Sequence, residues 1–254
     1  MVMGSLGPVP LVNRAARTLR PLLNAVLPTH PIPVTVLSGP ARGLRIVIEP
    51  QREKSYWAGT HERAVQTALV DMVEPGMTVW DIGAHTGFFS ALCSRRVGPS
   101  GRVHSFEPGP ETRTRLERTI RLNGFENVRV HACAVGPERR EGVLYDVGRS
   151  AQATLRPLGP RASGSNPIEV RTLSDLWDEL GPPDVIKVDA EGAEAGIVEG
   201  GARVLETATV SLVVEMHNDD AVTRILQLFP EHRRDQIDEQ HWAFRVGRTT
   251  DSSA

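Results

Sequence analysis

Short continuous apolar runs alternate with stretches of helical spacing through the middle of the chain. Val, Ile and Leu fill such runs when a strand is buried on both faces, and an intervening helix returns the chain to begin a parallel neighbour. The pattern predicts strands at 78–82, 102–107, 127–134, 184–189 and 209–215, with a last edge strand at 240–246. It predicts helices at 61–73, 88–96, 111–123, after 189 to about 205, and 221–229. The expected fold is α/β, a Rossmann-like, seven-stranded, mostly parallel sheet with helices on both faces.

The N-terminal part adds a hairpin and a helix to this core. Two short strands within residues 31–50 flank a turn through Ser38, Gly39 and Pro40. Residues 11–27 have apolar positions at helical spacing but are too rich in arginine to span a bilayer. They also lack the apolar core of a signal peptide. We expect this helix to pack on the domain or on a partner subunit, with peripheral membrane contact as the alternative.

Three parts are therefore expected along the chain: a helical extension at 1–30, one domain at 31–248, and a disordered tail at 249–254. Within the domain, the segment GRSAQATLRPLGPRASGSNP at 148–167 is rich in Gly, Ser and Pro and lacks periodicity. It is either a lid over the strand ends or a linker. The Arg/Glu face of the helix at 111–123 is expected to be solvated.

Composition narrows the class of protein. Hydrophobic residues make up 40% and charged residues 24%, which is typical of a globular protein. The formal charge of −2 lacks the basic excess of a nucleic-acid binder, so no nucleic-acid partner is expected. Cys93 and Cys133 both lie in apolar stretches, which favours two buried thiols in a reducing, cytoplasmic setting over a disulfide.

The strongest chemical signal is the stretch VWDIGAHTGFFS, residues 79–90. It places Asp81 at a strand end, then Gly83 and Gly87 in the turn before a helix. Ligands of open α/β sheets bind at this end of the strands. Gly83 is expected to let the backbone approach the ligand, and Gly87 to let the helix begin close to the strand. The G-x-x-x-G spacing differs from the dinucleotide pattern G-x-G-x-x-G, and Asp81 suits a cationic ligand that carries an amino acid.

Two further positions extend this site. Glu107 ends the next strand, where a ribose-binding carboxylate lies in such folds. Ala134, Val135 and Gly136 follow the third strand as a turn, where an adenine edge is expected.

Five segments in this order resemble the FkbM-type S-adenosyl-L-methionine-dependent methyltransferases: DIGAHTGFFS, GRVHSFEPGPE, NVRVHACAVG, IKVDAEGAE and LVVEMHN. The lead-in segments GPARGLRIVIEP and YWAGTHE are similar as well, so the resemblance spans about 31–218. It implies a class I methyltransferase fold with S-adenosyl-L-methionine as the methyl donor.

The resemblance implies that Asp81, Gly83, Gly87 and Glu107 hold the cofactor and that Asp189, Glu191 and Gly192 lie at the active-site rim. The full set of expected cofactor-binding residues is Asp81, Gly83, His85, Thr86, Gly87, Phe88, Glu107, Pro108, Ala134 and Asp189. His85 replaces the usual Asn of the family, which would make the polarity of the loop depend on pH.

Methylation of a hydroxyl requires a base near the acceptor oxygen. Asp189 and His217 follow neighbouring predicted strands and are the expected catalytic residues. The alternative for His217 is a hydrogen-bonded loop histidine. Asp189, Glu191, His217 and Asn218 also offer donors for a divalent metal such as Mg, although their spacing does not require one.

Two other features have both structural and functional interpretations. Lys187 lies inside a predicted strand, either at a sheet edge or paired with Asp189 or Glu107. Residues 56–62 resemble the family's cofactor-side cover, and Thr60 also suits the N-cap of the next helix.

The resemblance implies an O-methyltransferase that acts on a sugar or a secondary metabolite, with a small-molecule or glycan acceptor. A homodimer is one possible assembly. N-methylation on the same fold, a catalytically silent cofactor-binding scaffold, and a nicotinamide oxidoreductase are the alternatives.

Overall fold

The structure is a computed structural model that describes residues 24–146, 153–154, 165–190, 192–206, 210–216, 219–229 and 233–245. The strands are β1 (Ile32–Thr35), β2 (Arg45–Ile48), β3 (Thr78–Ile82), β4 (Arg102–Phe106), β5 (Val128–His131), β6 (Cys133–Val135), β7 (Arg140–Asp146), β8 (Ala153–Thr154), β9 (Ser165–Arg171), β10 (Val185–Val188), β11 (Ser211–Glu215), β12 (Arg233–Gln236) and β13 (His241–Arg245). The helices are α2 (Lys54–Ala58), α3 (Arg63–Met72), α4 (Phe88–Val97), α5 (Pro110–Asn123), α6 (Leu173–Leu180), α7 (Glu194–Gly200), α8 (Ala202–Glu206) and α9 (Asp219–Leu228).

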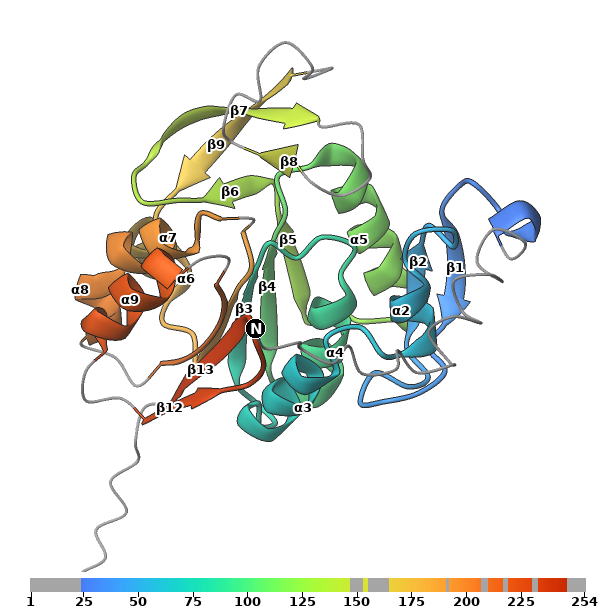
Figure 1. The fold of residues 1–254 in the computed structure, drawn as a ribbon, viewed down its shortest axis with the longest axis horizontal. Helices are drawn as coiled ribbons and strands as arrows, with labels where there is room; N and C mark the ends of the chain where they lie inside the picture. Colours follow the sequence, from blue (N-terminus) through green and yellow to red (C-terminus); the bar gives the residue numbers. More distant parts are fainter. Residues whose placement is uncertain are drawn as a thin grey trace, which may run out of the picture.

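A seven-stranded sheet in the order β12-β13-β11-β10-β3-β4-β5 forms the centre of the fold (Figure 1). The strands from β11 to β5 are parallel, and β13 and β12 add antiparallel pairs at one side. The predicted α/β class with a mostly parallel sheet is confirmed. The strand order reverses direction at β3, between β10 and β4, which is where such sheets bind ligands.

Helices cover both faces of this sheet because neighbouring strand residues point to opposite sides. Val79 packs into an apolar cluster with α3, α4 and the β1–β2 hairpin, whereas Trp80 and Ile82 pack into a second cluster with α6 to α9. Figure 1 shows the second group of helices, α6 to α9, together on one side of the sheet. The predicted hairpin is confirmed as the antiparallel pair β1–β2.

The hairpin is fastened to α5 by buried polar contacts. Arg115 of α5 is 7% exposed and donates to the backbone oxygen of Val47 at 3.1 Å. Its guanidinium also pairs with the buried carboxylate of Glu53 and with Glu49. The expectation that the Arg/Glu face of this helix is solvated is therefore wrong at Arg115, because the hairpin covers it.

A second, four-stranded sheet in the order β6-β9-β7-β8 was not predicted. The strand expected at 127–134 divides at Ala132 into β5, which stays in the main sheet, and β6, which pairs with β9 in the second. Ala134 and Val135 thus belong to a strand rather than a turn. The segment expected at 148–167 as a lid or linker supplies β8 and the start of β9, and the rest of it lies outside the described residues.

The edge of the main sheet also differs from expectation. The last strand, β13, lies between β11 and β12, so β12 is the edge. Its sequence, RRDQ, has no apolar residue and therefore gave no hydrophobic signal. Charged edge strands of this kind resist pairing with other chains.

Two helix starts depart from the predictions. The N-cap of α3 is Glu62 in a left-handed conformation without a side-chain cap bond, so the predicted cap at Thr60 is wrong. Helix α6 was not predicted, although Thr172 and Asp175 form a capping box whose spacing is visible in the sequence.

Cys93 and Cys133 are buried and unbridged, as expected from their apolar surroundings. Across the part of the chain that the structure describes, no helix has both the length and the apolar character needed to cross a membrane. Residues 11–23 of the predicted N-terminal helix and the tail at 249–254 lie outside the described residues, and 24–26 are helical.

We expect Arg115→Met to lower the free energy of unfolding by about 3–5 kcal/mol, because it leaves the carboxylate of Glu53 buried without its partner. Urea denaturation measures the change. Arg121→Met on the same helix is the control, since Arg121 is 68% exposed and its nearest carboxylate oxygen lies 3.9 Å away. We expect Arg121→Met to lower the free energy of unfolding by less than about 1 kcal/mol. Equal losses in the two variants would contradict the role of Arg115.

Candidate active site

The carboxyl ends of β3, β10 and β4 meet at one edge of the main sheet and bring Gly83, Asp189 and Glu107 together. The amide of Asp189 donates to the carbonyl of Ile82 at 3.1 Å, and the amide of Gly83 donates to Phe106 at 3.1 Å. The three predicted segments are thus joined by backbone hydrogen bonds where the strand order reverses.

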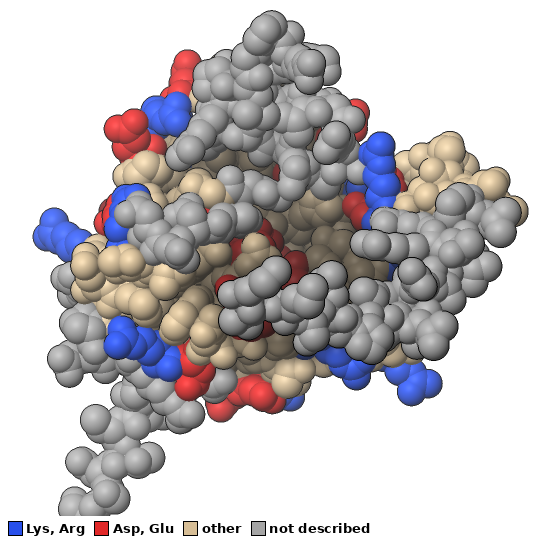
Figure 2. Space-filling view, viewed as in Figure 1, with Lys and Arg blue, Asp and Glu red and all other residues tan. Residues whose placement is uncertain are grey.

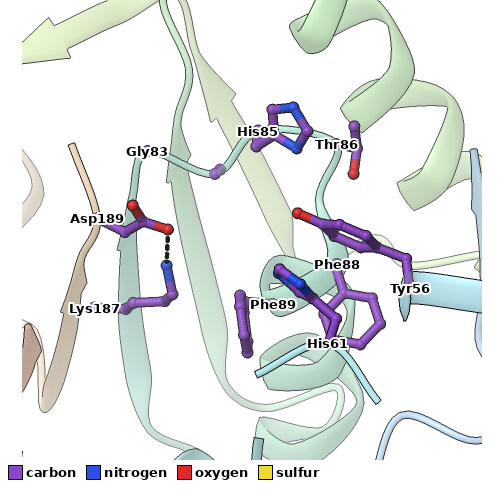
Figure 3. A pocket seen from close by; sticks show the side chains of 10 residues that line it. Tyr56, His61, Gly83, His85, Thr86, Phe88, Phe89, Lys187 and Asp189 are labelled. Atoms are coloured by element: carbon purple, nitrogen blue, oxygen red, sulfur yellow. Dashed lines mark hydrogen bonds and ion pairs between the residues drawn. The ribbon is translucent and has the colours of Figure 1, made fainter. Parts of the chain in front are cut away.

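A cavity with about 230 Å³ of empty volume opens at this edge. Its walls come from α2, the segment just before α3, the turn after β3, the start of α4 and the end of β10. They consist of Tyr56, His61, Gly83, Ala84, His85, Thr86, Phe88, Phe89, Lys187 and Asp189. Figure 3 shows Tyr56 and His61 across the cavity from the Lys187–Asp189 pair.

Gly83 is fixed by a close approach between two strand ends. Its φ is 77°, and a Cβ atom at this position would lie 1.7 Å from the carbonyl oxygen of Asp189. Gly87 has a φ of 81°, and a Cβ would lie 2.4 Å from Cδ1 of Leu116 in α5. Both glycines are therefore required by packing within the protein. We expected the backbone of Gly83 to approach a ligand, but its close neighbour is the residue that follows β10. We expected Gly87 to allow close contact between helix and strand, but its close neighbour is α5.

His85 lies in the turn with a φ of 49°, a left-handed conformation in which Asn and His are enriched. The backbone conformation at this position therefore favours residues such as Asn and His, which accounts for a histidine where the family usually has Asn. Burial, aided by the nearby charge of Arg115, lowers the pKa of His85 to about 3. The ring is neutral at ordinary pH, so the expected pH-dependent polarity of this loop is wrong.

Two buried polar atoms beside the cavity have no hydrogen-bond partner among the described residues: Nε2 of His85 and Oγ1 of Thr86. Thr86 is fully buried. Buried polar groups in proteins are nearly always paired, so both atoms fit a polar ligand in the cavity.

Glu107 follows β4 with its carboxylate ordered by three donors. Oε2 accepts from the amide of His85 at 2.9 Å, and Oε1 accepts from the amide of Gly109 and the hydroxyl of Thr112, each at 2.8 Å. Burial raises the pKa of this carboxyl above its ordinary value. A carboxylate has about four acceptor positions, so one stays available for a ligand hydroxyl such as that of a ribose.

Asp81 lies beneath the turn rather than in the cavity wall. It is 1% exposed, and its Oδ2 accepts from the hydroxyl of Ser90 at 2.6 Å. Burial raises the pKa of its carboxyl. Five expected cofactor-binding residues line the cavity, namely Gly83, His85, Thr86, Phe88 and Asp189. Asp81, Gly87, Glu107, Pro108 and Ala134 do not line it, and Ala134 packs against Leu144, Ile168 and Val170 in the second sheet.

Lys187 lies in the central strand β10 and pairs with Asp189, with Nζ 2.9 Å from Oδ2. The predicted pairing is confirmed, and the alternative of a sheet edge is wrong. The ammonium group also lies 4.7 Å from the centre of the Phe89 ring. Burial disfavours the charge of Asp189, but the ammonium of Lys187 outweighs it and lowers the pKa of the carboxyl.

Glu215 ends β11 and interacts with Asp189 through its side chain. Burial and the neighbouring charge of Asp189 raise the pKa of Glu215 well above its ordinary value. Lys187 is in direct contact with Asp189, so Asp189 carries the negative charge of the pair and Glu215 keeps the proton. Environments that separate two neighbouring carboxyl groups in this way are typical of active sites.

His217, Glu191 and Asn218 lie outside the described residues, so their predicted roles as base and metal donors stay predictions. Within the described ranges, no three His, Cys, Asp or Glu side chains gather as a metal site.

Sequence reasoning missed Tyr56, His61 and Phe89 as individual site residues. The rings of Tyr56 and His61 stack with centroids 3.7 Å apart, and Phe88 meets Tyr56 edge-on at 5.3 Å. Burial, with the nearby carboxylate of Glu62, raises the pKa of Tyr56 well above its ordinary value, so its hydroxyl stays protonated. Tyr56 and His61 fall within the predicted cover at 56–62, but sequence alone did not show which side chains turn inward.

A sequence model described as the methyltransferase FkbM domain matches residues 81–237. The hexuronic acid methyltransferase of Haloferax volcanii is 27% identical over 168 residues, which cover 61% of this chain and 62% of that protein. The tRNA (adenine(58)-N(1))-methyltransferase of Thermus thermophilus is 31% identical over 86 residues, 34% of this chain and 33% of that protein.

Among solved structures, an FkbM methyltransferase from Methylobacillus flagellatus is similar, with a TM-score of 0.49 and 19% identity over 73% of this chain and 51% of that one. The chain thus spans about three fifths of its hexuronic acid methyltransferase relative and a third of the tRNA methyltransferase. The family match covers more than half of the chain and includes the glycine turn and the ends of β3, β4, β10 and β11. The chain therefore belongs to the FkbM family of S-adenosylmethionine-dependent methyltransferases.

Proposed function

We propose that this chain transfers the methyl group of S-adenosylmethionine to a hydroxyl group of a sugar or secondary metabolite. The observation that carries the proposal is the position of Asp189, an ionised carboxylate in the wall of the cavity, directly against the glycine turn. S-adenosylmethionine supplies a methyl group already activated on a sulfonium cation. The chain then has to bind the donor, orient the acceptor and remove its proton.

The walls of the cavity suit a cationic ligand. Burial opposes ionisation of Glu62, but its contacts with His241 and His61 hold the pKa of its carboxyl far below the usual range. Asp189 places a carboxylate in the wall, paired with the ammonium of Lys187, and Glu62 places a second carboxylate behind the wall, paired with His241. The ring faces of Tyr56 and Phe89 add favourable cation–π surface. Glu107, Thr86 and His85 offer polar atoms to the remainder of the cofactor.

Asp189 is suited to orient the acceptor. A carboxylate whose pKa is lowered is a weak base, but it accepts a hydrogen bond from a hydroxyl and holds the oxygen in place. Such positioning contributes roughly 7–11 kcal/mol to intramolecular reactions. We assign proton removal to His217, because it follows β11, the strand next to β10.

The acceptor is proposed as a small molecule or glycan. The Haloferax relative acts, by its name, on a hexuronic acid. Figure 2 shows a hollow near the centre of the face that it draws, and acidic residues are visible in this hollow. The formal charge of −2 gives no basic excess of the kind with which nucleic-acid binders contact phosphates.

A transfer assay tests the proposal. The protein is incubated with S-adenosylmethionine labelled in the methyl group and a panel of sugars, uronic acid glycans, amines and tRNA. We expect label in an ether-linked methyl on a sugar hydroxyl. Label on nitrogen alone, or cofactor binding without transfer to any arm of the panel or to a cell extract, would contradict O-methylation.

We expect Glu107→Gln to weaken S-adenosylmethionine binding about 10- to 100-fold, equivalent to about 1.5–3 kcal/mol for a hydrogen bond to a charged group. The amide nitrogen replaces one of the two acceptor oxygens that the turn and the ligand share. Isothermal titration calorimetry gives the affinity, with exposed Glu111→Gln as the control. Asp81→Ala should act in the same direction through the turn above it. Unchanged affinity in both variants would discard this cofactor site.

If His217 is the base, the turnover rate should fall as pH decreases through an imidazole pKa, nominally about 6.5. His217→Ala should lose turnover but keep cofactor affinity. Near-wild-type turnover in this variant would reduce His217 to a loop residue.

Asp189→Asn should also lose turnover, but it leaves buried Lys187 without its partner and so lowers stability. The double variant Asp189→Asn/Lys187→Met removes both charges. We expect it to recover thermal stability without recovering turnover. Recovery of both would show that Asp189 acts only by holding Lys187.

A further inference from the structure

Glu62 lies directly behind the cavity wall and connects it to the opposite, C-terminal part of the sheet. Its Oε1 lies 3.0 Å from Nε2 of His61, which lines the cavity. Its Oε2 lies 3.5 Å from Nε2 of His241, the first residue of β13. His241 in turn has Nδ1 2.7 Å from Oδ1 of Asp238. These contacts form a continuous chain from Asp238 through His241 and Glu62 to His61, here termed the relay.

The inner contact of the relay has no substitute. Oε2 of Glu62 and Nε2 of His241 are both buried, and neither has a hydrogen-bond partner within the described residues. The ion pair between them is therefore the one interaction that compensates both atoms. His241 is 4% exposed, so water does not replace Glu62 as its partner.

The two flanking carboxylates favour the charged form of the His241 ring. An imidazole ring placed between two carboxylates donates to both only when both of its nitrogens carry protons. Burial disfavours this charge, but contacts with Glu62 and Asp238 raise the pKa of His241. Glu215 is its register neighbour on β11, and Glu62 also lies within the fields of Lys187 and Asp189.

The backbone at Glu62 is consistent with a conformation imposed by these contacts. Its φ is 41°, in the left-handed region that glutamate rarely adopts. Such conformations persist where the surroundings over-determine them, and they concentrate at functional sites. The strained residue lies between the stacked His61–Tyr56 pair of the wall and the helix α3 that follows.

We propose that His241 is a positioning residue for the cofactor, because it holds Glu62 and thereby fixes the His61–Tyr56 wall of the cavity. Every member of the relay lies outside residues 81–237, the part of the chain that matches the family domain. The inference rests on the proposed use of this cavity as the cofactor site. It assigns a role in cofactor binding to β13, a strand that β11 and β10 separate from β3 in the sheet.

A double-mutant cycle on cofactor affinity tests this role in the full chain. His241→Asn, Glu62→Gln and the double variant are titrated with S-adenosylhomocysteine and with S-adenosylmethionine by calorimetry. We expect each single variant to weaken binding about three- to tenfold. The double variant should bind the cofactor as tightly as the single variant with the lower affinity, since the two single substitutions remove the same contact.

The pH dependence separates positioning from general loss of structure. Wild-type affinity should fall as pH rises through the raised pKa of His241, because the ring then loses its second donor. His241→Asn should lack this alkaline step. Asp238→Asn is a milder change at a partly exposed residue, and it should shift the alkaline step to lower pH. This variant tests the pH dependence if His241→Asn does not fold.

His104→Asn is the matched control, because His104 is a buried histidine that contacts His131 and does not line the cavity. It should leave cofactor affinity unchanged even if the melting temperature falls. Wild-type affinity in His241→Asn, additive effects in the cycle, or an equal loss in His104→Asn would each overturn the proposal. If the wild-type chain bound neither probe, the proposed function itself would fail instead.

Discussion

The buried ammonium of Lys187 is the charge on which the electrostatics of the site depend. It lies in the central strand of the sheet, where desolvation opposes its charge, and it is held there by Asp189, Asp81 and Glu62. Burying a charge is costly unless it is paired, so these carboxylates are required in fixed positions. Because Lys187 contacts Asp189 directly, that carboxylate is ionised and its neighbour Glu215 is protonated. One buried lysine therefore assigns different protonation states to two adjacent acids.

The approach of β3 to the end of β10 gives this charge pair its location relative to the glycine turn. A side chain at Gly83 would collide with the carbonyl of Asp189, so the turn and the acid are in direct contact. The same turn donates the amide of His85 to Glu107. The positions that we propose to bind the cofactor and to orient the acceptor are thus parts of one packed unit, and a shift in either displaces the other.

The rest of the cavity is built from segments distant in sequence. The lead-in to α3 contributes Tyr56 and His61, and the final hairpin supports them through Glu62 and His241. The lead-in to α3 and strand β13 both lie outside the part that matches the family domain, whereas β12 falls within it. The shared domain supplies the strand ends and the glycine turn, whereas the flanks close one side of the cavity.

The sequence alone determined the parallel sheet, the glycine turn and the acids at the strand ends, because these features depend on local periodicity and on residues adjacent in the chain. It did not show β12 or β9, since RRDQ has no apolar residue and Pro167 interrupts the alternation that buries Ile168 and Val170. It left Lys187 open between a sheet edge and a pairing with Asp189 or Glu107. Only tertiary structure decided that partner, the neutral state of His85 and the contact of Glu62 with His241. The neutral state of His85 depends on burial. The Glu62–His241 contact and the choice of Asp189 over Glu107 as partner of Lys187 depend on how segments far apart in the chain are placed, which the order of residues does not encode locally.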